Sequence, residues 1–177
     1  MSPDLRGVMR TFATGVCVAT TYRDTPGGRR HDAVTVNSLG SISLDPPLIS
    51  LSFRKESVFL ADLLDTGRWV VSILPASARE LAGRLAGPRS SRVSEIAVLE
   101  ATPGERTGAL VLDGASWLEC ALRQPIDLGD HTLVVGEVLA TGHDRQSPAL
   151  VFVHGTYHSV TDPRQVSGPG QWGEAVG

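Results

Sequence analysis

Several classes of protein are excluded by what the sequence has little of. Only two of its 177 residues are cysteines, Cys17 and Cys120, and both lie inside apolar runs and not at metal or redox spacing. The sequence therefore predicts neither a disulfide-stapled scaffold nor a metal site. Lysine is almost absent, since Lys55 is the only one among 16 basic residues. The formal charge of -3 argues against a general nucleic-acid-binding surface.

Long hydrophobic runs are also absent. No uninterrupted apolar stretch reaches the length of about 18 residues that a membrane span requires, and residues 1–15 lack the apolar segment of a signal peptide. We therefore expect a cytoplasmic protein with no membrane partner. The content of 41% hydrophobic and 20% charged residues is typical of a soluble globular domain. We expect one domain over residues 1–162 and a disordered, glycine- and proline-rich tail over 163–177.

β-Branched and apolar runs between turn residues predict a mainly β protein with a few short helices. Helices are expected over residues 5–12 and 57–64, and a third from a capping box of Ser77 and Glu80 to Gly87. Residues 89–108 are polar and poorly periodic, so we expect a surface excursion there. The predicted strands are residues 16–21, 33–37, 48–53, 69–74, 117–122, 131–141 and 149–160. Short strands without βαβ alternation favour an antiparallel barrel decorated by helices.

Glycines and histidines in the last two predicted strands have structural interpretations. Gly136 and Gly155 lie inside these strands, where glycine marks a bulge or a close backbone approach. His154 and His158 would share one face of a strand, but two histidines without an acidic or thiolate companion make a poor metal site. A match to the dinucleotide-binding pattern at residues 168–173 has no strand before it and only four residues after it, so we reject it.

Three short segments carry side chains suited to a ligand, and each also has a plainer interpretation. Residues 35–41 place hydroxyls and a carboxamide at the end of a strand, which suits a polar heterocycle or phosphate, but also an ordinary turn. Residues 52–57 place Arg54, Lys55 and Ser57 at a helix start, which suits a phosphate or a solvated cap. His131 beside Asp130 opens a strand, where it can donate a proton, bond a ligand amide or stand in an exposed turn.

Five stretches that occur in order between about residues 5 and 160 point to one family. They are Phe12-Ala13-Thr14-Gly15-Val16, Thr35-Val36-Asn37-Ser38, Ser41-Ile42-Ser43-Leu44-Asp45-Pro46-Pro47-Leu48, Gly129-Asp130-His131-Thr132 and Gly155-Thr156-Tyr157. In these stretches the chain resembles the flavin reductase family, the small NAD(P)H-dependent enzymes that supply reduced flavin to two-component monooxygenases. The resemblance implies a mainly β fold, an antiparallel split β-barrel with short inserted helices, that works as a homodimer with flavin near the subunit interface.

The resemblance also implies roles for individual residues. The isoalloxazine and ribityl chain of the flavin would lie along residues 32–38. The ribityl chain and phosphate would be held by residues 52–54 and 57–59, and the nicotinamide would lie beside His131 and the last predicted strand. The implied flavin-binding residues are Asp32, Ala33, Val34, Thr35, Asn37, Ser38, Ser52, Phe53, Arg54, Ser57, Val58, Phe59, Arg84 and Leu85. The implied nicotinamide-side residues are His131, Phe152, His154 and Tyr157. His131 is the implied catalytic residue, and we expect it to position the nicotinamide and not to act as an obligatory acid.

The reaction implied by the resemblance is hydride transfer from NADH to FAD or FMN, with a separate monooxygenase receiving the reduced flavin. NADPH is less favoured than NADH, because no basic cluster for its additional phosphate is evident. Ala33-Val34 and Leu39-Gly40 depart from the family pattern, so the choice between FAD and FMN stays open. Two alternatives also stay open: a non-catalytic flavin- or haem-binding split barrel, and an enzyme like the pyridoxamine-phosphate oxidases.

Overall fold

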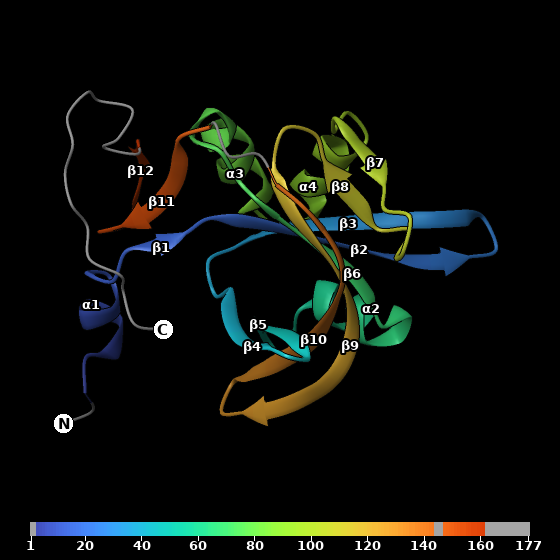
Figure 1. Cartoon of the computed structure of the whole chain (residues 1–177), viewed down its shortest axis with the longest axis horizontal. Helices are drawn as coiled ribbons and strands as arrows, with labels where there is room; N and C mark the ends of the chain where they lie inside the picture. The colour runs from blue at the N-terminus through green and yellow to red at the C-terminus, as the bar shows by residue number, and fades with distance from the viewer. Residues whose placement is uncertain (1–2, 144–146, 162–177) are drawn as a thin grey trace.

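The protein is mainly β, as the sequence predicted. The computed structural model describes residues 3–143 and 147–161. All strand pairings in this part of the chain are antiparallel. A large curled sheet occupies the centre of the molecule, and short helices lie above and below its long strands (Figure 1). None of the described helices is long and apolar enough to cross a membrane.

The large sheet has seven strands. In pairing order they are β3 (Gly28–Val36), β2 (Cys17–Thr25), β6 (Arg68–Ile73), β9 (Ser116–Leu128), β10 (His131–Gly142), β5 (Pro47–Arg54) and β4 (Gly40–Leu44). The hairpin that the sequence predicted from residues 117–122 and 131–141 is confirmed as β9 and β10. Residues 37–39 connect β3 directly to β4, the opposite edge strand of the sheet. The curl brings β4 and β5 beneath β2 and β3 in the view of Figure 1.

The single strand expected over residues 149–160 is wrong. This segment is a hairpin of β11 (Ala149–Val153) and β12 (Thr156–Val160), and β1 (Thr14–Gly15) pairs with β11. His154 and Gly155 form its turn with φ values of 52° and 81°. Gly155 is therefore a turn residue, because glycine adopts this left-handed backbone at little cost. His154 and His158 do not share a strand. The remaining pair is β7 (Ala101–Pro103) with β8 (Leu110–Leu112).

Two helices differ from the prediction. A 3₁₀ turn (Ala76–Ala78) precedes α3 (Arg79–Leu85), and no side-chain cap is formed at Ala78, so the capping box is wrong. The expected surface excursion contains α4 (Arg89–Ile96), whose buried residue is Arg92. An arginine on the buried face removes the apolar periodicity by which helices are recognised. In the described part of the chain, α1 (Leu5–Met9) begins where it was predicted but ends before residue 12, and α2 (Val58–Thr66) lies close to the predicted residues 57–64.

The core explains one of the strand glycines. Trp69 of β6 is fully buried, and a Cβ atom at Gly136 would lie 2.2 Å from its Cζ2 atom. The pairing of β10 with β9 also shifts register between Val135 and Gly136. Both predicted roles of Gly136, a close approach and a bulge, are therefore confirmed. The same core cluster contains Cys17 and Cys120, and burial raises the pKa of each thiol to about 12.

Candidate functional site

A cleft of about 720 Å³ lies where the ends of β3 and β5 meet the start of α2. It brings together residues that the sequence analysis singled out in three separate segments. The predicted residues that line it are Val34, Thr35, Asn37, Ser38, Ser52, Phe53, Arg54, Ser57 and His131. Val36, Glu56 and Ala86 complete the lining. Ala86 follows α3 and was not predicted, because nothing in its local sequence distinguishes it from other alanines.

Strand register brings these segments together. His131 at the start of β10 is paired with Arg54 at the end of β5. The loop after β3 is joined to β5 by Ser38, whose hydroxyl accepts from the Ser52 amide at 3.0 Å and lies 3.3 Å from the Ser52 carbonyl oxygen. The Ser38 hydroxyl therefore acts mainly within the protein. Thr35 donates to the Ala82 carbonyl in the middle of α3 at 2.7 Å, so α3 is held against β3.

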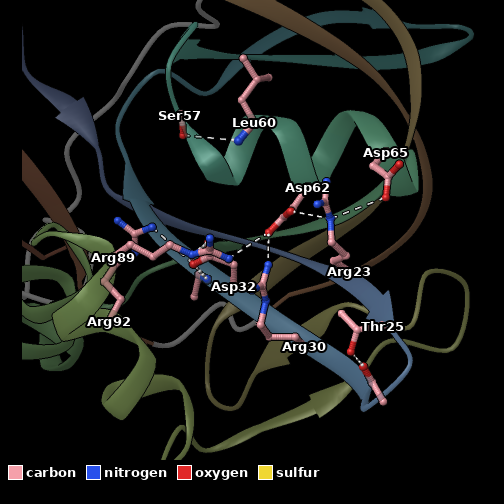
Figure 2. Close-up of polar contacts among 12 residues, drawn as sticks. Arg23, Thr25, Arg30, Asp32, Ser57, Leu60, Asp62, Asp65, Arg89 and Arg92 are labelled. Atoms are coloured by element: carbon pink, nitrogen blue, oxygen red, sulfur yellow. Dashed lines mark hydrogen bonds and ion pairs between the residues drawn. The ribbon is translucent and has the colours of Figure 1, made fainter.

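The start of α2 forms the cationic end of the cleft. Ser57 is the N-cap of this helix, and its hydroxyl accepts from the Leu60 amide at 3.3 Å (Figure 2). The first-turn amides of a helix carry partial positive charge. The Lys55 ammonium lies 3.8 Å from Asp127, whereas the exposed Arg54 guanidinium has no ion-pair partner among residues 3–143 and 147–161. Arg54 is thus the cation most available to an anionic group in the cleft.

His131 is oriented by its neighbour. Its Nδ1 atom lies 2.7 Å from Oδ1 of Asp130, and the hydrogen bond from His131 holds the pKa of the Asp130 carboxyl below its usual range. Asp130 is therefore ionised at neutral pH, so Nδ1 carries the proton that it accepts. This leaves Nε2 as the ring nitrogen available to a ligand. A histidine held in this way can bond an amide or a phosphate at the edge of the cleft.

A second cavity, of about 820 Å³, adjoins the cleft and shares Asn37 and Ser38 with it. The predicted residue Phe152 lines this cavity. Tyr157 packs its ring 5.3 Å from the Phe152 ring, and burial raises the pKa of its hydroxyl. His154 lines neither cavity. Its backbone amide donates to the Arg10 carbonyl at 2.7 Å, which fixes the turn of the last hairpin to the end of α1.

Six of the predicted flavin-binding residues do not line the cleft. Ala33, Phe59 and Leu85 are buried in the core, so their side chains contact other core residues. Arg84 pairs with Glu95 at 2.7 Å and lines a different pocket. Val58 is exposed at the start of α2, outside the residues that line the cleft. Asp32 is also buried, where it forms ion pairs with two arginines of α4.

The comparisons with known proteins agree with one another. A model of the flavin reductase-like domain matches residues 9–161. The NADH-dependent FAD reductase of Streptomyces globisporus is 32% identical over 155 residues, which cover 86% of this chain and 82% of the relative. The probable flavin reductase of Rhizobium meliloti (strain 1021) is 32% identical over 136 residues, which cover 77% of this chain but only 42% of that relative.

Solved structures are similar over most of the chain. The flavin reductase component BorF of a bacterial two-component tryptophan halogenase is 36% identical with a TM-score of 0.80, and the match covers 89% of this chain and 97% of BorF. The NADH:FAD oxidoreductase SgcE6 of Streptomyces globisporus, in complex with NAD and FAD fragments, is 30% identical with a TM-score of 0.79. That match covers 87% of this chain and 89% of SgcE6.

Proposed function

The chain belongs to the family of flavin reductase-like domains, and from this premise we propose that it transfers hydride from NADH to FAD or FMN and supplies the reduced flavin to a partner monooxygenase. The observation that carries the proposal is the convergence of residues 34–38, Arg54, Ser57 and His131 on one cleft. Two relatives are named as reductase components of larger systems: BorF, of a two-component tryptophan halogenase, and the reductase component of the flavin-dependent trigonelline monooxygenase of Acinetobacter baylyi (strain ATCC 33305 / BD413 / ADP1).

The residues present fit a flavin nucleotide. The strand end at Val34 and Thr35 offers backbone groups and an apolar edge to a flat ring, and Asn37 adds an exposed carboxamide. The unpaired Arg54 guanidinium and the first-turn amides of α2 supply positive charge for phosphate at the other end. A single arginine and a helix start supply this charge locally, which suits a chain whose overall charge is -3. FAD and FMN share the ring and the first phosphate, so both fit this arrangement.

The protein's contribution is to hold two rings in contact. The bound nicotinamide and flavin carry the hydride chemistry themselves. Residues 34–38 orient the flavin ring, while Arg54 and the α2 start hold its phosphate. His131, held through Nδ1 by Asp130, orients the nicotinamide through Nε2. Phe152 lines the adjoining cavity on the nicotinamide side, and Tyr157 supports it through the contact between the two rings. Holding reactants in the correct geometry accounts for a large part of enzymatic rate enhancement.

The proposal includes a homodimer of split barrels. Helix α1 has no buried residue: Leu5, Val8 and Met9 are 68%, 67% and 50% exposed, and Phe12, just after the helix, is 61% exposed. Met9 and Phe12 lie beside the cavity that adjoins the cleft. A short helix with this much exposed apolar surface needs a partner, because an isolated helix of this length is unstable in water. A second copy of the chain would cover α1 and complete the nicotinamide side of the site. We place this dimer in the cytoplasm, where NADH is available.

An anaerobic spectroscopic assay tests the proposed activity. The protein is mixed with NADH or NADPH and with FAD or FMN, and the visible flavin absorbance is followed. We expect bleaching that depends on the protein and is faster with NADH than with NADPH. A protein without bleaching activity towards any combination of these flavins and nicotinamides would not be a flavin reductase. Flavin binding without bleaching would instead indicate the non-catalytic carrier.

A substitution at His131 tests its assigned role. We expect His131→Ala to raise KM for NADH by about 3- to 10-fold, the value of one lost hydrogen bond, with a smaller change in kcat. Asp130→Asn should also raise KM for NADH, but by a smaller factor, because the His131 imidazole loses its orienting partner and is still present. If His131→Ala left both KM for NADH and turnover unchanged, the assignment of His131 would be wrong.

A further inference from the structure

Behind the cleft, two buried aspartates and four arginines form one ion-pair cluster (Figure 2). The side chains of Asp32 on β3 and Asp62 on α2 are 2% and 1% exposed. Oδ1 of Asp62 lies 2.9 Å from Arg23, and its Oδ2 lies 3.3 Å from Arg30. Buried carboxylates of this kind require several donors, because transfer of an unpaired charge out of water is very costly.

Arg89 is the residue that joins the two carboxylates. Its Nε atom lies 3.1 Å from Oδ2 of Asp32, and its Nη2 atom lies 3.0 Å from Oδ2 of Asp62. Arg92, one turn later on α4, contacts Asp32 at 3.3 Å and does not reach Asp62. In Figure 2 Arg89 reaches from α4 toward Asp32 and Asp62, which face each other between β3 and α2. The contact with Asp62 is a hydrogen bond and the contact with Asp32 is an ion pair, so one planar guanidinium holds both carboxylates.

The elements joined by Arg89 are walls of the cleft. Asp32 lies two residues before Val34 on β3, and Asp62 lies on the helix whose N-cap is Ser57. Helix α4 follows the segment that contains Ala86, and Arg92 donates to the Gly87 carbonyl at 3.0 Å. Strand β3, helix α2 and the connection between α3 and α4 therefore all contact the ion-pair cluster. None of the cluster residues lines the cleft itself.

We propose that Arg89 is a positioning residue for flavin binding, which sets the spacing between β3 and α2 by bridging Asp32 and Asp62. This inference rests on the proposed function. Loss of the bridge lets the strand that orients the ring move relative to the helix that holds the phosphate. The residue acts without contacting the flavin, so its loss weakens the binding of any molecule that carries the isoalloxazine ring.

The geometry allows the bridge to be removed without leaving an unpaired buried charge. In Arg89→Met, Asp62 keeps Arg23 and Arg30, and Asp32 keeps Arg92. The variant is therefore expected to fold, with the carboxylates separated into two independent groups. Arg89→Lys retains one positive charge but cannot present two coplanar donors. Asp65→Asn is the matched control, because Asp65 is 65% exposed at the edge of the cluster and lies 3.7 Å from Arg23.

The experiment compares the dissociation constants of FAD and riboflavin, measured by fluorescence titration, with steady-state kinetics. We expect Arg89→Met and Arg89→Lys to raise both constants by about tenfold, the size of a typical long-range coupling. The kcat at saturating flavin and KM for NADH should change less than about twofold. Asp65→Asn should leave all four quantities unchanged. A general loss of folding would instead reduce the active fraction and leave the dissociation constant of the remainder unaltered.

Three outcomes would overturn the positioning role. Unchanged dissociation constants in Arg89→Met would show that the bridge does not affect the cleft. A loss of affinity for FAD but not for riboflavin would show that Arg89 binds phosphate directly. Full affinity in Arg89→Lys would show that charge alone is sufficient. Absence of NADH-dependent flavin reduction by the wild type overturns the proposed function separately, and absence of any flavin binding overturns both.

Discussion

At the scale of single residues, His31 shows how burial alters a titratable group. It lies on β3 between Arg30 and Asp32, two members of the ion-pair cluster. Its ring packs edge-on against Tyr22 with ring centroids 5.9 Å apart, and its Nδ1 atom has no hydrogen-bond partner in the described residues. Burial lowers the pKa of His31 below its ordinary value, and the positive charge of Arg29 lowers it further. The neutral ring is therefore favoured in the folded protein.

This shift predicts a loss of stability in mild acid. Below pH about 6.5 the unfolded chain takes up a proton at His31 that the folded chain resists, so the contribution present above this pH declines as pH falls. We expect His31→Gln to flatten the dependence of Tm on pH between about pH 5 and 7. The exposed His143, substituted in the same way, is the control. Identical Tm profiles of His31→Gln and the wild type across this range would contradict the prediction.

The site residues that local sequence identified share a common property. Ser38, Arg54, Ser57 and His131 lie at the ends of strands or the start of a helix, where motifs and turn chemistry are local. Asp32 is different, since its partner Arg92 is 60 residues away. No neighbouring residue signals that this aspartate is buried in ion pairs. The sequence could therefore locate the segment but not the direction of each side chain.

At the scale of elements, strand β10 depends on a glycine. Gly136 allows the strand to pass directly against the Trp69 ring of β6, at the centre of the core. A methyl group there would overlap atoms that cannot move without displacing other buried residues. Overpacking of this kind typically costs about 1–3 kcal/mol.

We therefore expect Gly136→Ala to lower the free energy of unfolding by about 1–3 kcal/mol, measured from the urea midpoint at an unchanged m value. Gly83→Ala is the control, because it lies in α3 with no atom within 4 Å of the added Cβ. The control should be neutral or stabilising by up to about 1 kcal/mol, since alanine favours helices. Equal unfolding midpoints for the two variants would mean that the core accommodates the methyl group freely.

The elements that were predicted correctly have apolar patterns of their own. Strands β2 and β6 are buried along most of their length, and β10 alternates between half-buried and buried residues over its first half, so their β-branched runs can be recognised in the sequence. Helix α4 buries an arginine, and the β11–β12 turn has only two residues within a continuous apolar run. Helix α4 was missed because its buried side chain forms ion pairs, and the β11–β12 hairpin was predicted as one strand because its tight turn is short.

At the scale of the whole molecule, the exposed apolar face of α1 leads to a prediction about assembly. We expect the wild type to have a mass in solution of twice 18.8 kDa by light scattering. Phe12→Asp should shift the protein toward the monomer and weaken flavin binding, because a charge would be buried in the interface. Val98→Asp, at a residue that is 77% exposed beyond α4, is the control. A wild-type monomer, or a dimer unaffected by Phe12→Asp, would rule out α1 as the interface.

The family resemblance, the main strands and the segments that meet at the candidate cleft could be read from the sequence, because composition, periodicity and strand-end motifs depend only on neighbouring residues. Only the folded structure shows that Asp32, Phe59 and Leu85 are buried and do not line the cleft, and that Arg89 joins two of its walls. Side-chain direction and long-range ion pairs depend on strand register and helix packing, which no local pattern encodes. For this reason the ligand was predictable from the chain, whereas the framework that holds its site was not.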